Sequence, residues 1–287
     1  GRGILRCPPG PSLWILLRPG HNVASMSDHT PASETRPRVR LYLEQPLAAG
    51  QPVAVSQEQA HYLTSVMRLG PGDAIALFNG QHGEWRARIA QSAKRAVTLI
   101  CEAQTAPPLP PPDLWLLFAP IKKARTDFIV EKAVELGAAR ILPVQTDFTN
   151  SERIRRDRLQ AHAIEAAEQS GATFVPEVAD LEPLARLLAR WPQGRSLWWA
   201  DESLAQAPSP PEPAPAPAAI LIGPEGGFSP VEKTRLAALP FLRRLSLGPR
   251  ILRADTAAVA ALTLWQARHG DWTTPAPIVM PRISSGG

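Results

Sequence analysis

The sequence contains little cysteine and no long apolar run. Its 287 residues include only two cysteines, Cys7 and Cys101, which lie far apart and form no Cys-x-x-Cys pair. This spacing argues against a disulfide-stapled scaffold and against a structural zinc site, so no metal is expected. It fits a reducing, cytoplasmic location. Because no run of about eighteen apolar residues occurs, neither a transmembrane helix nor a membrane partner is expected.

Two signatures of nucleotide binding are also missing. The glycine-rich stretch near residue 225 does not have the spacing Gly-x-Gly-x-x-Gly, and no Gly-x-x-x-x-Gly-Lys-Ser/Thr occurs in the chain. A standard dinucleotide site and a P-loop ATPase site therefore have no support.

The net charge of the chain is slightly positive. The chain has 31 lysines and arginines against 26 aspartates and glutamates, which leaves a formal net charge of +5. Such an excess favours an anionic partner such as nucleic acid, although it also explains simple solubility. The hydrophobic fraction of 44% is ordinary for a globular protein, and the length is sufficient for two domains.

The first part of the chain divides into an extension and a small domain. Residues 1–37 hold an apolar run of only five residues, "LWILL", which is too short for a signal peptide. We expect a disordered or non-native extension there. Residues 38–106 predict short strands around one helix, which Ser56 and Gln59 cap and Gly70 ends. This pattern predicts a small β-barrel module.

The second part follows a proline-rich linker. Five prolines fall among residues 104–113, and they predict a semi-rigid spacer at 107–112. Residues 113–275 then alternate unbroken apolar strands with helices, and Thr126 is expected to be the N-cap of the helix in "TDFIVEKAVELG". This alternation predicts an α/β domain whose parallel sheet is covered on both faces. A disordered Pro/Ala-rich loop and a C-terminal tail are expected at residues 205–217 and 276–287.

One predicted strand ends in "LIGPEGGFSPVE", residues 221–232. In a parallel α/β sheet, ligands bind at the carboxyl ends of the strands, and glycine lets a ligand lie against the main chain. Ser229 and Glu232 then predict a capping box for the next helix, with Pro230 in its first turn. The alternative is a tight strand-to-helix turn without a ligand.

A second strand ends in "LSLGPRILRADTA", residues 245–257. The Ile-Leu pair at 251–252 stands between Arg250 and Arg253, which would suit an apolar floor for an aromatic base with cations beside it. The alternative is that Arg253 and Asp255 pair at the surface and cap the following helix.

Five motifs, in order along the chain, resemble one family: "HYLTSVMRLGPGD", "KKARTDFIVEKAVELGAARILPV", "AIEAAEQSG", "IGPEGGFSPVE" and "LSLGPRILRADTA". They are similar to the ribosomal RNA small subunit methyltransferase E family of the SPOUT superfamily, over about residues 38–272. The resemblance implies a PUA-like β-barrel RNA-binding domain followed by a SPOUT methyltransferase domain with a C-terminal trefoil knot. It also implies that a homodimer methylates N3 of a specific uridine in 16S rRNA with S-adenosylmethionine (SAM).

Two positions depart from the family pattern. Ala172 stands where an arginine is usual after "EAAEQSG", and Asp255 stands where a glutamate is common. The missing arginine would weaken one RNA contact, whereas the shorter carboxylate keeps its charge.

The resemblance also assigns residues to the cofactor, and the chemistry of methyl transfer to uridine points to candidates for the reaction. SAM would lie against Leu221, Ile222, Gly223, Pro224, Glu225, Gly226, Gly227, Ser246, Leu247, Gly248, Ile251, Leu252, Arg253, Thr256 and Ala257. Arg253 would stabilise negative charge on the uracil oxygens while N3 loses its proton. Glu225 and Asp255 are candidates for the base or for a residue that orients an arginine, and the sequence does not choose between them. A structural role for either carboxylate, as an N-cap or a loop anchor, is a further alternative.

Phosphate contacts would fall to basic side chains. The candidates are Arg38, Arg40, Arg68, Arg86, Arg88, Lys122, Lys123, Arg125, Arg153, Arg155, Arg156 and Arg158, and the cluster at 153–158 is the densest. Two other functions stay open. One is a SPOUT methyltransferase that acts on tRNA or on a ribose 2′-OH, and the other is a non-catalytic RNA-binding protein of ribosome assembly.

Overall fold

The computed structural model describes residues 37–93, 96–149, 153–205 and 216–273. The expected N-terminal extension, Pro/Ala-rich loop and C-terminal tail lie outside these ranges, apart from residues at their edges. Among the described residues, no helix is long and apolar enough to span a membrane.

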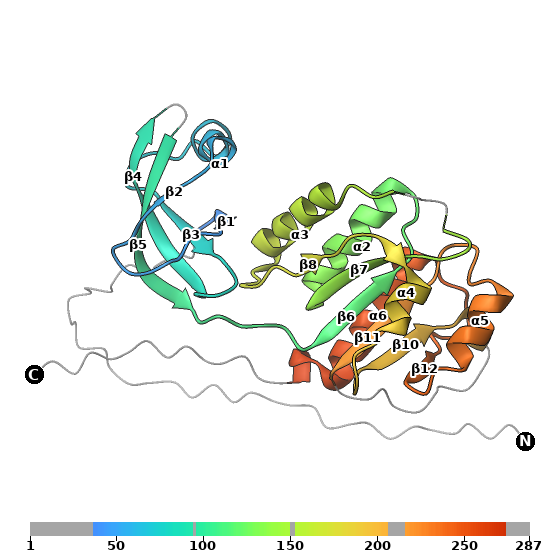
Figure 1. The fold of residues 1–287 in the computed structure, drawn as a ribbon. Helices are drawn as coiled ribbons and strands as arrows, with labels where there is room; N and C mark the ends of the chain where they lie inside the picture. Colours follow the sequence, from blue (N-terminus) through green and yellow to red (C-terminus); the bar gives the residue numbers. More distant parts are fainter. Residues whose placement is uncertain (1–36, 94–95, 150–152, 206–215, 274–287) are drawn as a thin grey trace, which may run out of the picture. The chain divides into compact units, whose positions relative to one another are not determined.

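The first sheet contains five strands in the spatial order β1–β3–β4–β5–β2 (Figure 1). They are β1 (Arg40–Tyr42), β2 (Pro52–Ala54), β3 (Ala74–Phe78), β4 (Glu84–Ala93) and β5 (Ala96–Ala106). β1 pairs with β3 in parallel, and the other pairings are antiparallel. Leu77, Ala87 and Leu99 belong to its own hydrophobic core. The strands expected in this part of the chain are present, and β2 is an addition that its short length concealed.

One short helix, α1 (Gln57–His61), continues into a π-helical turn (Tyr62–Val66). The predicted capping box is confirmed. The Gln59 N–H donates to the Ser56 hydroxyl at 3.1 Å, and the Ser56 N–H donates to the Gln59 side chain at 3.1 Å. Such a reciprocal pair satisfies two backbone donors that the helix start would otherwise leave open.

Two local predictions about helix ends were wrong. The turn ends before Gly70, because Arg68 already takes a left-handed conformation with φ of 56°. Thr126 is not an N-cap, because α2 begins at Lys123 and Thr126 is buried inside it. Its hydroxyl instead donates to the carbonyl of Ile121 at 3.0 Å and accepts from the Ile121 N–H at 3.1 Å.

The second sheet is parallel throughout, as predicted, with the spatial order β12–β10–β11–β6–β7–β8 (Figure 1). Its strands are β6 (Leu114–Phe118), β7 (Arg140–Gln145), β8 (Glu177–Val178), β10 (Ser196–Ala200), β11 (Ala218–Ile222) and β12 (Leu242–Leu245), and β9 (Glu182–Pro183) pairs with β7 off this path. β12 was expected to be a buried strand, but it lies at the edge and exposes Arg243 and Arg244. The trefoil knot stays a prediction.

Helices cover both faces of this sheet. They are α2 (Lys123–Glu135), α3 (Arg156–Ser170), α4 (Leu184–Ala189), α5 (Pro230–Ala237) and α6 (Ala254–His269). Buried side chains of α2, α3 and α6 share one core with Trp198, and those of α4 and α5 share the other core with Trp199. Successive residues of a strand point to opposite faces, so the adjacent tryptophans pack into different cores.

Candidate functional site

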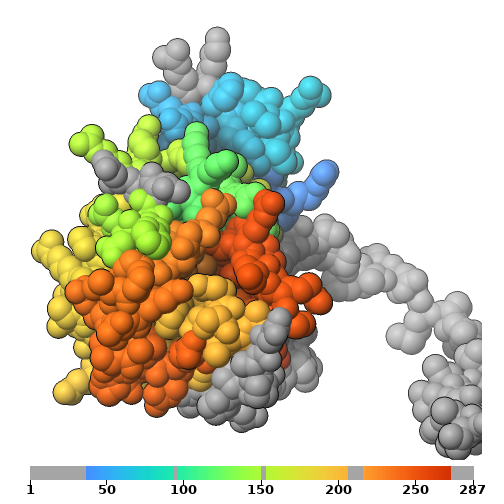
Figure 2. Space-filling model, turned by 90° about the vertical axis from the view of Figure 1, so that its right-hand side faces the viewer, coloured from blue at the N-terminus to red at the C-terminus, as the bar shows by residue number. Residues whose placement is uncertain are grey.

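One candidate site is a hollow of about 680 Å³, hereafter the candidate cofactor pocket. Its walls come from the segments that follow the carboxyl ends of β6, β10, β11 and β12. This is the edge where open parallel sheets bind ligands. On the molecular surface, the green β6–α2 segment borders the orange and red C-terminal segments (Figure 2).

The glycine-rich loop after β11 forms one wall, and the capping box of α5 fixes the end of this loop. The capping box of α5 is confirmed, because the Ser229 N–H donates to Glu232 at 2.9 Å and the Glu232 N–H donates back to the Ser229 hydroxyl at 3.2 Å. Gly227 has φ of 69°, in the left-handed region that favours glycine. A Cβ at Gly223 would lie 2.9 Å from the ring of Phe228. At Gly223, the absence of a side chain is therefore required for packing within the loop itself.

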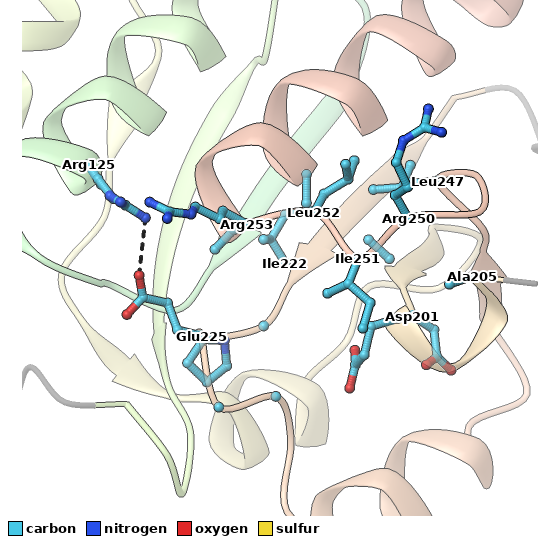
Figure 3. Close-up of a pocket in the computed structure, with 18 of the residues that line it drawn as sticks. Arg125, Asp201, Ala205, Ile222, Glu225, Leu247, Arg250, Ile251, Leu252 and Arg253 are labelled. Atoms are coloured by element: carbon cyan, nitrogen blue, oxygen red, sulfur yellow. Dashed lines mark hydrogen bonds and ion pairs between the residues drawn. The ribbon is translucent and has the colours of Figure 1, made fainter.

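The loop between β12 and α6 forms a second wall. Leu247, Leu252 and Ala257 offer apolar surface, and Ile251 is 78% exposed. Arg253 occupies the N-cap position of α6 but makes no side-chain capping bond. Its side chain points toward the end of the pocket that holds Arg125 and Glu225 (Figure 3).

An arginine from α2 ties these two walls together. Arg125 donates to Glu225 at 3.2 Å, and its Nε lies 3.8 Å from Asp255 (Figure 3). The predicted surface pair of Arg253 and Asp255 does not occur among the described residues. The side chain of Arg253 has no hydrogen bond or ion pair in the part of the chain that the structure describes. The pocket thus holds two arginines at one end: Arg125, which is ion-paired with Glu225 and Asp255, and Arg253, which has no ion pair with the described residues.

Most predicted cofactor-binding residues do line the pocket. They are Ile222, Gly223, Pro224, Glu225, Gly226, Gly227, Leu247, Gly248, Ile251, Leu252, Arg253 and Ala257. Leu221 instead points into the opposite core, and the hydroxyl of Ser246 donates to the carbonyl of Leu204 at 2.9 Å. Thr256 is exposed and does not line the pocket either.

The segment after β10 adds two carboxylates that sequence reasoning missed. Asp201 and Glu202 line the pocket, and Figure 3 shows Asp201 well apart from Arg125 and Glu225. Asp201 is buried and accepts from Arg244 at 2.6 Å, whereas Glu202 pairs with Lys233 at 3.3 Å. "WWAD" is an apolar strand that ends in a polar residue, so the rule used for the other two strands could have found it.

The expectation of an RNA contact at Arg40 is corrected by its surroundings. Its Nε donates to buried Glu84 at 2.7 Å, and its other nitrogens donate to the carbonyls of Ala167, Glu168 and Ala172 at 2.6 to 2.9 Å. The side chain is only 8% exposed. Because these nitrogens already donate hydrogen bonds to acceptors inside the protein, Arg40 has a structural role.

The other predicted RNA contacts fall into two groups. Several already have partners: Arg86 and Arg88 pair with Glu102, Arg155 with Asp157, Arg158 with Asp127, and Arg156 donates to the carbonyl of Val178. The side chains of four others have no hydrogen bond or ion pair with described residues: Arg38, Arg68, Lys122 and Lys123. Lys122 and Arg125 line the candidate cofactor pocket, where the sequence had not placed them.

Comparison with known proteins identifies the family. A family described as an RNA methyltransferase domain matches residues 108–266, and one described as an RNA methyltransferase PUA domain matches residues 55–101. The ribosomal RNA small subunit methyltransferase E of Synechocystis is 30% identical, over 73% of this chain and 71% of its own. The chain belongs to the ribosomal RNA small subunit methyltransferase E family. The Rickettsia conorii member is 29% identical, over 78% of this chain and 93% of its own.

A solved member of the methyltransferase E family shares this fold. The crystal structure of the Neisseria gonorrhoeae enzyme, bound to S-adenosylmethionine, superposes with a TM-score of 0.73 at 28% identity. The match covers 82% of this chain and 99% of that one. The predicted combination of a PUA-like domain with a parallel α/β methyltransferase domain is therefore confirmed. Among the described residues, no cluster of His, Cys, Asp or Glu could hold a metal ion.

Proposed function

We propose that this protein transfers a methyl group from SAM to N3 of a specific uridine in 16S rRNA of the small ribosomal subunit. The target would be uridine 1498 in the usual rRNA numbering. The observation that carries the proposal is an uncommitted arginine, Arg253, in a pocket at the carboxyl ends of four parallel strands of a methyltransferase E family member. The prediction of SAM as cofactor is confirmed by the SAM-bound family member.

The residues of the pocket fit this cofactor. A volume of about 680 Å³ lies in the range of small-molecule sites. Ile222, Leu247, Leu252 and Ala257 would contact its apolar parts, and the exposed main chain around Gly226 would hydrogen-bond its polar parts. When bound, SAM supplies a methyl group on a positively charged sulfur.

Arg253 would supply the electrostatic part of the reaction. The N3 of uridine carries a proton at neutral pH, and loss of that proton places negative charge on the uracil oxygens. Because the Arg253 guanidinium has no ion pair with the described residues, it can face those oxygens without first breaking such a pair. The remaining requirement is alignment of N3 with the methyl group, which the pocket walls would provide.

The two carboxylates near Arg253 would have a positioning role. Glu225 and Asp255 both lie against Arg125, so either would have to leave that cation before it could accept a proton. We therefore assign them to holding Arg125 and the two loops in place. Of the two alternatives, base and arginine orienter, the contacts with Arg125 favour the orienter.

The proposal extends to the RNA-binding surface and to the assembly of the protein. The first sheet and the exposed cations Arg38, Arg68, Lys122 and Lys123 would hold the rRNA, with the linker at 107–112 between the two domains. A homodimer in the cytoplasm is part of the same proposal.

The test is methyl transfer from labelled SAM to purified RNA targets. We expect label in 30S subunits that lack the modification and none in tRNA. Label in tRNA alone would favour the alternative tRNA enzyme. Binding of 30S subunits without binding of SAM would favour a non-catalytic assembly protein.

A further inference from the structure

An aromatic side chain stands at the protein surface just beyond the carboxyl end of β7. Phe148 follows the last residue of this strand by three positions and is 46% exposed. Because β7 pairs in parallel with β6, the two strands end at the same edge of the sheet (Figure 1). Phe148 therefore lies at the edge that carries the candidate cofactor pocket, although it does not line the pocket itself.

Hydrogen bonds hold the turn that carries this ring. Within the turn, the Thr149 N–H donates to the carbonyl of Thr146 at 3.1 Å, and the Thr146 N–H donates to the Thr149 hydroxyl at 2.9 Å. The Asp147 N–H donates to Glu232 at 3.0 Å, and the Asp147 carboxylate accepts from the hydroxyl of Ser229. The turn is thus fixed to the capping box of α5, which also fixes the glycine-rich loop.

Phe148 packs against the glycine-rich loop of the candidate cofactor pocket. A Cβ at Gly226 would lie 3.5 Å from the Cβ of Phe148 and 3.8 Å from its ring, which is ordinary contact. Gly226 lines the pocket, so Phe148 stands just outside it, against a residue of its wall. Since Gly226 has no side chain, it covers little of the ring, and much of the ring stays open to solvent.

A ring in this position suits a nucleobase. To be methylated at N3, a uracil must expose its Watson–Crick edge, so the target base has to leave its stack. The next base in the strand then loses a stacking partner. An exposed aromatic side chain can take the place of that partner for any base, because every base has a π-face.

The surroundings of Phe148 favour an RNA strand over a protein partner. Protein interfaces are built on contiguous apolar patches, whereas Asp147 and Thr149 on either side of the ring are polar. The pocket beside it is lined by Lys122 and Arg253, whose side chains have no ion pair with the described residues. Such cations attract a polyanion.

We propose that Phe148 stacks on the base next to the target uridine and thereby holds the RNA strand at the mouth of the candidate cofactor pocket. This inference rests on the proposed function for its substrate. The neighbouring base fits better than the target base, because Phe148 lies outside the pocket that the target has to enter. A stacking contact releases no counter-ions, so its contribution to affinity should not depend on salt.

The experiment measures equilibrium binding to 30S subunits that lack the modification, over a series of KCl concentrations. We expect Phe148→Ala and Phe148→Leu to raise the Kd by about 5- to 100-fold, with the slope of log K against log salt unchanged. Phe148→Tyr keeps an aromatic face and should stay within about threefold of the wild type. Phe128→Ala is the matched control, because Phe128 is 39% exposed on α2 and does not line the pocket, and it should keep the wild-type Kd.

Two further measurements separate stacking from a structural role. SAM affinity, measured by calorimetry, should be the same in all of these proteins, and a fall in Phe148→Leu would make Phe148 a support of the pocket and overturn the RNA contact. Analytical ultracentrifugation should show one oligomeric state for all of them. Dissociation of Phe148→Leu alone would assign the ring to an interface between two copies of this chain and overturn the stacking.

The outcomes also distinguish this proposal from the proposed function. Equal 30S affinities for Phe148→Leu and the wild type would overturn the stacking even if the wild type methylates 30S subunits. Weaker binding by Phe148→Leu, without any methyl transfer by the wild type, would keep the stacking and overturn the methylation. If Phe148→Ala does not fold, the leucine variant carries the test.

Discussion

Arg125 donates a hydrogen bond to Glu225 at 3.2 Å, although 100 residues separate them in the chain. The same guanidinium lies 3.8 Å from Asp255. One side chain of α2 thus joins the loop after β11 to the first turn of α6, and both of these segments line the candidate cofactor pocket.

Replacing Arg125 should weaken SAM binding only modestly. The side chains of Arg125 and Glu225 are 30% and 44% exposed, and exposed ion pairs contribute about 0.2 to 1 kcal/mol. We expect Arg125→Gln to raise the Kd for SAM by about two- to fivefold in calorimetry. Lys132→Gln, which breaks another exposed pair of α2, should leave the Kd unchanged. A rise beyond about fiftyfold would instead mean that Arg125 contacts the cofactor directly.

Adding a methyl group at Gly223, which follows β11, should destabilise the protein. A Cβ at Gly223 would lie 2.9 Å from the ring of buried Phe228, which packs edge-on against Trp199. Overpacking of this kind costs about 1 to 3 kcal/mol, so Gly223→Ala should lower the free energy of unfolding by that amount in urea denaturation. Gly70→Ala meets no atom within 4 Å and should change it by less than about 0.5 kcal/mol. Equal stabilities for the two variants would refute this packing.

Local signals in the sequence predicted much of this fold. Both capping boxes involve residues only three apart, so that the pattern Ser-x-x-Gln or Ser-x-x-Glu is enough to find them. The strands of the parallel sheet appeared as apolar runs because both of their faces are covered. Since such strands bind ligands at their carboxyl ends, two walls of the pocket could also be anticipated.

The rest depended on contacts between distant parts of the chain. Asp201 and Glu202 join the pocket because β10 lies between β11 and β12, and the sequence alone does not reveal that order. Arg125 looked like a surface cation until its partner 100 residues away was known. Arg40 was misjudged for the same reason, because the carbonyls that it meets are 127 to 132 residues away.

The buried pair of Arg40 and Glu84 should be important for stability. Removing one partner of such a pair leaves an uncompensated charge and costs about 3 to 5 kcal/mol. We expect Arg40→Met to lower the free energy of unfolding by that amount, with part of the loss recovered in Arg40→Met/Glu84→Gln. Arg86→Met breaks a more exposed pair with Glu102 and should cost at most about 1 kcal/mol. A loss below about 1 kcal/mol for Arg40→Met would show that the buried pair is not essential.

Glu168 should make stability depend on pH. Burial raises the pKa of Glu168 above its ordinary 4.5, while the N–H of Tyr42 and nearby Arg40 oppose this shift. The folded protein therefore binds a proton more readily than the unfolded chain, so this group stabilises the fold below pH 4.5 and loses that contribution as pH rises through the folded pKa. Relative to Glu168→Gln, the wild type should be more stable at pH 4 than at pH 8, by urea denaturation. A difference that is constant or grows with pH would contradict the shift.

The central claim is that Arg253 assists methyl transfer to N3 of uridine. The most direct measurement is nucleoside mass spectrometry of 30S subunits after reaction with SAM, for the wild type and Arg253→Ala. We expect 3-methyluridine as the product. The rate for the variant should be about 100- to 1000-fold lower, with SAM affinity almost unchanged, because one preorganised donor contributes about that much. A 2′-O-methylated nucleoside, or a variant that reacts at the wild-type rate, would contradict the account.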